Sequence, residues 1–316
     1  MTMQRETHLT MAHDADDGAP AGVITVALGI DEAYAPHAAA TISSIRQQSP
    51  GAAFQFLILH DGVPQHARMR VEASAPDATF IWTEITDSNV LALSGRDHIS
   101  RATFYRLVLP HLAPAGVRRI IYLDSDLIVT RDLRALWSVD LQGAPLGAVC
   151  DSGMAWRSFA EAYGLDPGAG PYFNAGVLLI DLEHVRRERL FDQALERLQA
   201  HDLHYMDQDA LNLALWGRWR PLDPIWNVQH TMLLGDAAQG VPDDMLAHGR
   251  KPAIIHYTGH HKPWLKDSYH PFAWRYWRAL RRTTYFHDVA RRQGVTLVHR
   301  MRLMMRDAAH SALLRG

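Results

Sequence analysis

Short apolar runs alternate with segments of helical periodicity through the first part of the chain. Strand-like runs rich in β-branched and aromatic residues occupy residues 23–30, 54–59 and 79–85. Helical spacing follows each of them, at residues 31–48, 65–73 and 101–112, the last with Ser100 as an N-cap. This alternation predicts an α/β fold with a mostly parallel sheet covered by helices on both faces.

The second part of the chain continues the alternation less regularly. Further strands are expected at residues 118–123, 146–149, 177–180 and 253–256, and further helices at 183–200 and 208–215. Residues 151–171 and 227–251 are rich in glycine, proline and polar side chains, so we expect loops there. Ligands of such sheets bind at the carboxyl ends of the strands, and we therefore expect these loops to border the site.

One apolar run, Arg118 to Thr130 (RRIIYLDSDLIVT), is interrupted by two aspartates. Burying an ionised carboxylate without a partner is costly, so Asp124 and Asp126 require a cation, a metal or a hydrogen-bond donor. Residues two apart in extended chain share a face, which lets both carboxylates converge on one ion. Two chemistries fit: a divalent metal that serves a nucleotide diphosphate, or an aspartyl nucleophile with its acid/base partner in a phosphatase.

Composition limits the class of protein. The chain has 316 residues, 47% of them hydrophobic, and a formal net charge of −2, so no chain-wide positive field argues for nucleic acid. Cys150 is the single cysteine, which excludes an internal disulfide and is compatible with a reducing cytoplasm. No stretch reaches the length of a transmembrane helix. Residues 1–21 lack the apolar core of a signal peptide and are expected to form a flexible leader.

The end of the chain differs from the rest in charge. Beyond Pro271 there are ten arginines, no lysine, and only Asp288 and Asp307 as acids. Leucine, valine and methionine positions among the arginines suit a helix on an anionic membrane surface, or a helix that packs on the core by the same apolar stripe. We expect an Arg-rich helical extension at residues 269–316.

Six short motifs occur along the chain in a fixed order. They are Gly29-Ile-Asp-Glu-Ala-Tyr34, His98-Ile-Ser-Arg-Ala-Thr-Phe-Tyr-Arg106-Leu, Tyr122-Leu-Asp-Ser-Asp126, Tyr172-Phe-Asn-Ala-Gly-Val-Leu-Leu-Ile180, Asp207-Gln-Asp-Ala-Leu-Asn212 and His256-Tyr-Thr-Gly-His-His-Lys-Pro-Trp264. Together they resemble the retaining sugar-nucleotide glycosyltransferases grouped as family eight, which include bacterial lipopolysaccharide galactosyl- and glucosyltransferases and glycogenin. The set is far more specific than any one motif.

The resemblance implies a GT-A type, Rossmann-like domain at residues 22–268 that binds a UDP-hexose with Mn²⁺ or Mg²⁺. The implied reaction transfers galactose or glucose, with retention of configuration, to a glycan or lipid-linked glycan acceptor such as lipopolysaccharide. The single cysteine, the lack of a signal peptide and the Arg-rich tail together favour a cytoplasmic protein, peripheral on the inner face of the cytoplasmic membrane. Two alternatives stay open: a phosphatase of the HAD type with Asp124 as nucleophile, and a non-catalytic protein that binds nucleotide sugars.

Residue by residue, the resemblance assigns the metal to Asp124, Asp126 and His256, a suitable set of two carboxylates and an imidazole. The donor is assigned to Gly29, Asp31, Tyr34, Arg106, Asp124, Ser125, Asn174, Ala175, Gly259 and Lys262. The small side chains before the 177–180 strand would leave room for a sugar ring. Catalytic roles fall to Asp151, Asp207 and Gln208.

The assigned residue types have suitable chemistry. The Asp31 carboxylate can accept a hydrogen bond from uracil, and the Tyr34 ring can stack on it. Lys262 provides a point charge for a phosphate, and Gln208 can stabilise an oxocarbenium-like centre. A purely structural role is the alternative for Asp31 and Asp207, because aspartate is a favoured helix N-cap.

Overall fold

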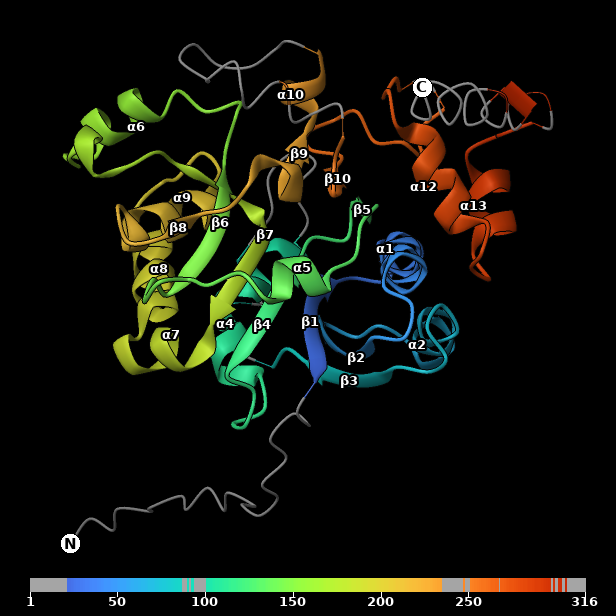
Figure 1. Cartoon of the computed structure of the whole chain (residues 1–316), viewed down its shortest axis with the longest axis horizontal. Helices are drawn as coiled ribbons and strands as arrows, with labels where there is room; N and C mark the ends of the chain where they lie inside the picture. Colours follow the sequence, from blue (N-terminus) through green and yellow to red (C-terminus); the bar gives the residue numbers. More distant parts are fainter. Residues whose placement is uncertain are drawn as a thin grey trace, which may run out of the picture.

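The computed structural model describes residues 22–86, 101–234, 251–266 and 268–296, with the isolated positions 90, 92, 93, 247, 298, 301, 302 and 305. A seven-stranded mixed sheet forms the centre (Figure 1). Its strands in spatial order are β3 (Thr79–Glu84), β2 (Ala53–His60), β1 (Val23–Ile30), β4 (Arg119–Leu123), β7 (Phe173–Asp181), β6 (Leu146–Cys150) and β8 (Arg220–Pro221). The predicted leader and Ser100 lie outside the described residues.

The prediction of a mostly parallel sheet is confirmed. β1 pairs in parallel with β2 and β4, and β2 with β3, whereas β7 runs antiparallel to both β4 and β6. Helices α1 (Ala35–Gln48) and α2 (Gln65–Glu72) share one hydrophobic core with one face of the sheet. A second core on the other face includes α4 (Tyr105–Leu112), α7 (Leu182–Glu188), α8 (Leu190–Ala200) and α9 (Met206–Leu215). Burial on both faces explains why the strands are continuous apolar runs.

Several predicted boundaries were wrong. The helix expected at 183–200 is two helices, because Arg189 adopts a left-handed conformation (φ 54°) that ends α7. The strand expected at 177–180 begins at Phe173, so Asn174 to Gly176 lie inside β7 and not before it. The first helix starts at Ala35, four residues late, since Asp31 accepts a hydrogen bond from the Tyr34 amide in a turn before it.

The segments expected as loops contain short helices. α6 (Trp156–Ala162) and a 3-10 turn (Pro167–Ala169) lie in the first, and α10 (His230–Leu234) lies in the second. A 3-10 turn (Arg101–Phe104) precedes α4, and another (Pro224–Asn227) precedes β9 (Val228–Gln229). Helix α5 (Arg134–Trp137) follows β5 (Leu127–Val129). None of these has a long periodic pattern, which is the signal that sequence periodicity detects.

A second, three-stranded sheet was not anticipated. It has the order β5 (Leu127–Val129), β10 (Ile254–His256) and β9 (Val228–Gln229). β10 runs antiparallel to β5, with His256 opposite Leu127, and the Tyr257 amide donates to the Asp126 carbonyl at 3.0 Å. This pairing brings the end of β10 to the two aspartates after β4, across more than 120 residues of sequence.

The described part of the Arg-rich extension packs against the body of the protein. Helices α12 (Ala273–Leu280) and α13 (Phe286–Arg292) lie beside α1 and α2 (Figure 1). Buried Tyr276, Trp277 and Val289 belong to the same core as β1 and α1. Among the described residues, none of the helices combines the length and the apolar character needed to cross a membrane.

Candidate functional site

A cavity of about 600 Å³ opens at the carboxyl ends of β1 and β4. All the site residues proposed from the sequence line it except Asp31 and Ala175. They are Gly29, Tyr34, Arg106, Asp124, Ser125, Asp126, Asp151, Asn174, Asp207, Gln208, His256, Gly259 and Lys262. Ala175 is buried, and its backbone amide and carbonyl bind Gln208 and Arg106. The tertiary structure thus brings seven separate segments of the chain together around one cavity.

Asp124, Asp126 and His256 converge in this cavity. Each offers a ligand atom, and the three atoms lie within 4.8 Å of one another. The His256 Nε2 atom is 3.3 Å from Asp126 Oδ1 and 3.7 Å from Asp124 Oδ2. Two carboxylates and an imidazole suit a divalent cation of the Mn²⁺ type, so the donor set and its spacing fit a metal.

The His256 ring is fixed from behind by Asn227. Asn227 Oδ1 lies 3.0 Å from His256 Nδ1, and Asn227 Nδ2 donates to Asn174 Oδ1 at 2.9 Å. An amide oxygen at Nδ1 favours the proton there, which leaves Nε2 with a lone pair directed at the carboxylates. Asn227 therefore orients a candidate metal ligand, and it carries no sequence signal beyond being an isolated polar residue next to a strand.

Arg106 bridges two carboxylates beneath the cavity. Its Nη2 atom donates to Asp124 Oδ1 at 2.8 Å, and its Nε atom lies 2.9 Å from Asp207 Oδ2. Although burial disfavours the cation, Asp124 and Asp207 raise the pKa of Arg106 above its ordinary value. Burial in turn raises the pKa of Asp207 to about 6, against the opposing charge of Arg106. The guanidinium is thus a fixed positive charge in the wall of the cavity.

Lys262 provides a second positive charge. Its Nζ atom contacts the Asp126 carboxylate and donates to the Tyr257 carbonyl at 2.7 Å. Burial alone would raise the pKa of Asp126, but Lys262 and His256 together hold it well below its usual value. Gly259 has φ +69°, which favours glycine and lets the loop after β10 reverse direction above the site.

Asp151, Asn174 and Gln208 form a polar cluster on the other wall. Asp151 Oδ2 accepts from Asn174 Nδ2 and from Gln208 Nε2, both at 3.0 Å. Gln208 Oε1 accepts from the Ala175 amide at 2.9 Å. Both ends of the Gln208 amide are therefore engaged, and the group is a dipole of fixed direction facing the cavity.

Asp207 is not the N-cap of α9. Tyr205 holds that position, and its amide donates to Asp209 Oδ2 at 2.8 Å, so Asp209 satisfies the helix end. Asp207 instead faces Arg106 and accepts from Thr103 Oγ1 at 3.0 Å. Thr103 lies within the second motif and was not singled out. A capping role for Asp207, the structural alternative considered above, is excluded.

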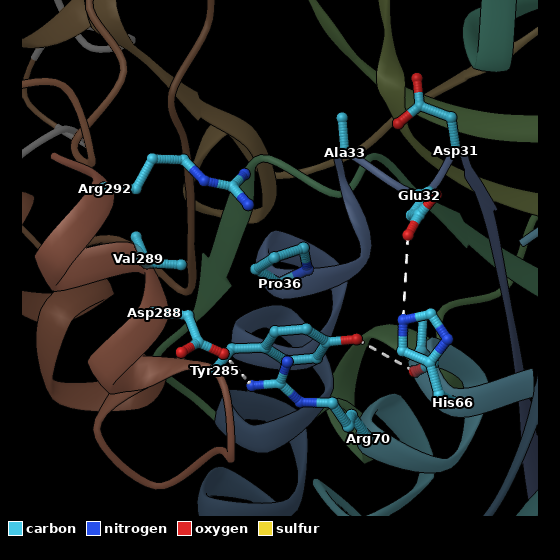
Figure 2. A pocket seen from close by; sticks show the side chains of 11 residues that line it. Asp31, Glu32, Ala33, Pro36, His66, Arg70, Tyr285, Asp288, Val289 and Arg292 are labelled. Atoms are coloured by element: carbon cyan, nitrogen blue, oxygen red, sulfur yellow. Dashed lines mark hydrogen bonds and ion pairs between the residues drawn. The ribbon is translucent and has the colours of Figure 1, made fainter. Parts of the chain in front are cut away.

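Tyr34 lines the end of the cavity nearest β1, and Asp31 lies in the turn just before it. Asp31 borders a neighbouring cavity of about 590 Å³ between the β1–α1 turn, α2 and α13 (Figure 2). There Arg70 lies over the Tyr285 ring, 3.9 Å from its centroid, and its Nη2 donates to Asp288 at 2.6 Å. The turn that carries Asp31 and Tyr34 therefore separates the two cavities.

This arrangement can hold an anionic ligand through a metal. The carboxylates and His256 offer a cation site, while Arg106 and Lys262 supply fixed positive charge beside it. The polar cluster around Gln208 offers hydrogen bonds to a neutral, hydroxyl-rich group. A phosphate ester of a sugar has these two parts.

Comparisons with known proteins agree with this chemistry. A sequence profile described as glycosyl transferase family 8 matches residues 25–268. General stress protein A of Bacillus subtilis (strain 168) is 34% identical over 60% of this chain and 65% of its own length. Lipopolysaccharide 1,2-glucosyltransferase of Escherichia coli (strain K12) is 27% identical over 85% of this chain and 80% of its own.

Solved structures support the same fold. The galactosyltransferase LgtC, solved in complex with donor and acceptor sugar analogs, matches with a TM-score of 0.72 and 27% identity over 83% of this chain and 96% of its own. The chain spans between 50% and 65% of the length of several curated relatives that it matches. Because the profile covers well over half of the chain and every motif around the cavity lies within it, the protein belongs to glycosyl transferase family 8.

Proposed function

We propose that this protein transfers a hexose, galactose or glucose, from a UDP-sugar to a glycan acceptor with retention of configuration. The observation that carries the proposal is the convergence of Asp124, Asp126 and His256 in a cavity that also exposes Arg106 and Lys262. A bound Mn²⁺ or Mg²⁺ would supply the positive charge that a diphosphate requires. Gly29, Ser125 and Gly259 would bring backbone close to that group, since all three line the cavity.

Different residues would bind the nucleoside diphosphate and the sugar of the donor. Tyr34, with Asp31 at its turn, would bind the nucleoside. Lys262 would contact the departing phosphate, where negative charge grows in the transition state. Asp151, Asn174 and Gln208 would bind the hydroxyls of the sugar, and Arg106 would hold Asp124 and Asp207 in place, with Ala175 as its backbone partner.

Retention is best explained by transfer on one face of the sugar. The hydrogen bonds of the Gln208 amide to Asp151 and Ala175 support a role for Gln208 in stabilising a positive anomeric carbon, and they argue against a mobile nucleophile. We expect the bond from the anomeric carbon to the phosphate oxygen to break as the acceptor oxygen bonds to that carbon on the same face. The acceptor proton passes to the departing phosphate.

The names of relatives suggest the acceptor. One is a lipopolysaccharide 1,2-glucosyltransferase and another, from Salmonella typhimurium, a lipopolysaccharide 1,3-galactosyltransferase. We propose a lipopolysaccharide-type or other lipid-linked glycan acceptor, reached from the cytoplasm by a peripheral protein. Residues 22–268 would form the catalytic domain, residues 1–21 a leader, and the Arg-rich end of the extension a contact with anionic lipid.

A panel of UDP-sugars tests the proposal. Hydrolysis or transfer is measured with Mn²⁺, with Mg²⁺ and with chelator, and compared with Asp126→Ala. We expect Mn²⁺-dependent turnover of UDP-galactose or UDP-glucose that Asp126→Ala abolishes. Failure of every UDP-sugar to bind in the presence of Mn²⁺ would overturn the proposal.

The same panel separates the alternatives. Phosphatase action needs Asp124 as a free nucleophile, whereas here Asp124 is bound by Arg106 and by the Tyr122 hydroxyl at 3.1 Å. Release of phosphate from simple esters without nucleotide would nonetheless favour that chemistry. Tight binding of a UDP-sugar without turnover would indicate a non-catalytic binding protein.

A further inference from the structure

A buried group of three aromatic side chains lies behind the loop that carries Lys262. His37, in the first turn of α1, is 8% exposed and stacks on Trp264 with 3.6 Å between ring centroids and 16° between planes. His37 Nδ1 lies 2.7 Å from the Tyr276 hydroxyl of α12. We call His37, Trp264 and Tyr276 the aromatic clamp. None of the three was assigned a role from the sequence.

The aromatic clamp joins three segments that are far apart in sequence. His37 lies three residues after Tyr34, whose ring meets it edge-on at 5.4 Å. Trp264 lies two residues after Lys262 and ends the loop that begins at Gly259. Tyr276 belongs to the C-terminal extension. The two contacts of His37, with Trp264 and with Tyr276, therefore connect the turn at the nucleoside end, the loop at the phosphate end and the extension.

Histidine has the right chemistry for this place. Its flat ring provides the surface that stacks on Trp264, and its Nδ1 atom forms a hydrogen bond with the buried hydroxyl group of Tyr276. Burial is the main cause that lowers the pKa of His37 to about 3, and burial raises the pKa of Tyr276 well above its usual value. Both groups are consequently neutral at physiological pH, and the stack carries no charge that would repel Lys262.

The position of the loop from Gly259 to Trp264 depends on contacts with neighbouring side chains. Between β10 and α12 its backbone forms short turns, from the Lys262 amide to the His260 carbonyl and from the Leu265 amide to the Lys262 carbonyl. The Trp277 Nε1 atom adds a bond to the Pro263 carbonyl at 2.9 Å. The Lys262 side chain then has to reach inward to the Asp126 carboxylate and the Tyr257 carbonyl. Small shifts of Trp264 would carry Lys262 away from the site.

We propose that His37 and Tyr276 are positioning residues that hold Trp264, and with it Lys262, at the phosphate end of the donor site. This inference rests on the proposed function. It adds that the C-terminal extension helps to build the donor site, since Tyr276 comes from α12. His37 and Tyr276 act through Lys262 and need not touch the substrate.

Calorimetric titration of the full chain with UDP and Mn²⁺ tests the inference. His37→Gln removes the ring, and Tyr276→Phe removes only the hydroxyl. Each is expected to weaken UDP binding about tenfold, as does Lys262→Ala. The decisive variant is His37→Gln combined with Lys262→Ala: if His37 acts through Lys262, the His37 change adds less than about twofold once the lysine is gone.

Tyr285→Phe is the matched control. The Tyr285 hydroxyl donates to the Ala67 carbonyl at 3.0 Å, so this change also deletes one buried phenol bond between the extension and the body (Figure 2). It should lower the melting temperature by a similar amount and leave UDP affinity within about twofold, because the Tyr285 hydroxyl and ring contact Ala67 and Arg70 of α2.

The outcomes are distinct. Unchanged UDP affinity in both His37→Gln and Tyr276→Phe overturns the positioning role while leaving the proposed function standing. Full additivity of His37→Gln and Lys262→Ala also overturns it, because a general loss of stability would act independently of the lysine. If the unaltered protein binds no UDP with Mn²⁺, the proposed function and this inference fail together.

Discussion

Gly176 faces His256 so closely that a side chain at position 176 would collide with the ring. A Cβ atom on Gly176 would lie 2.1 Å from His256 Cε1 and 2.8 Å from Asp124 Oδ2. Gly176 does not have a positive φ, so the glycine is required by space and not by backbone conformation. The small residue that the sequence suggested would accommodate a sugar instead accommodates two candidate metal ligands.

Gly176→Ala should therefore disrupt the cation site. The added methyl group must displace His256 or Asp124, and we expect at least a hundredfold loss of Mn²⁺ affinity, since displacing even a supporting residue costs 10 to 100-fold. Mn²⁺ binding can be followed by electron paramagnetic resonance. Gly147→Ala is the control: its Cβ would meet only the side-chain ends of Leu141 and Leu222, so stability should fall while Mn²⁺ binding persists.

Asn227→Ala should weaken the metal site without removing a ligand. The change frees His256 Nδ1 and leaves Asn174 without one partner, so we expect roughly 10 to 100-fold lower Mn²⁺ affinity. Asn227→Asp keeps an acceptor at Nδ1 and should retain more of the affinity. Equal Mn²⁺ affinity in Asn227→Ala and the unaltered protein would contradict the orienting role.

Arg106 should tolerate neither loss of charge nor loss of shape. Arg106→Met leaves the buried Asp207 and the half-buried Asp124 without their shared partner, and loss of one partner of a buried pair typically costs about 3–5 kcal/mol of folding free energy. Arg106→Lys keeps the charge, but one ammonium cannot reach both carboxylates in the same geometry, so weaker UDP binding is expected. Arg101→Lys is the control, because Arg101 forms an exposed ion pair with Asp61. It should change the free energy of unfolding by less than about 1 kcal/mol.

Acid should destabilise the protein through its buried histidines. Burial lowers the pKa of His37 and of His270 to about 3, from an ordinary value of 6.5. The unfolded chain binds these protons first, so stability present above pH 6.5 is lost as pH falls towards 3. For His37 the loss at pH 5 is about 2 kcal/mol.

Calorimetric melting of His37→Gln and of the unaltered protein at pH 8 and pH 5 measures the stability that is lost when His37 is protonated. The loss on acidification should be smaller in the variant. The difference between the two proteins isolates His37 from groups such as Asp207, whose raised pKa acts in the opposite sense. Parallel losses in both proteins would show that His37 does not titrate as its burial implies.

The extension should separate into a structural part and a lipid-binding part. Deleting residues 297–316 leaves the buried Val295 and α13 in place, so the melting temperature should stay within a few degrees, while sedimentation with anionic phosphatidylglycerol vesicles is lost. Deleting residues 273–316 also removes buried Trp277 and Tyr276 and should abolish folding. Vesicles of neutral lipid serve as the control. Failure of the full-length protein to sediment with anionic vesicles would disprove lipid binding.

Most strands of the central sheet and the residue types of the site can be predicted from the sequence alone. Buried strands of this sheet are apolar on both faces, so the sequence predicts strands at residues 23–30 and 118–123. Asp124 and Asp126 stand out because burying a carboxylate is costly. The ordered motifs identified the family. Such signals are local, and each needs only a few neighbouring residues to be read.

The neighbours of those residues come from contacts between distant parts of the fold. The pairing of β10 with β5 brings His256 next to Asp124 and Asp126. Asn227 orients the His256 ring, and the missing side chain of Gly176 leaves the space that this ring occupies. His37 joins Trp264 to Tyr276 across more than 200 residues. These contacts depend on packing between segments that are distant in sequence. A local pattern of hydrophobic and polar residues predicts helices and strands, but it does not specify which distant side chain will contact a given residue.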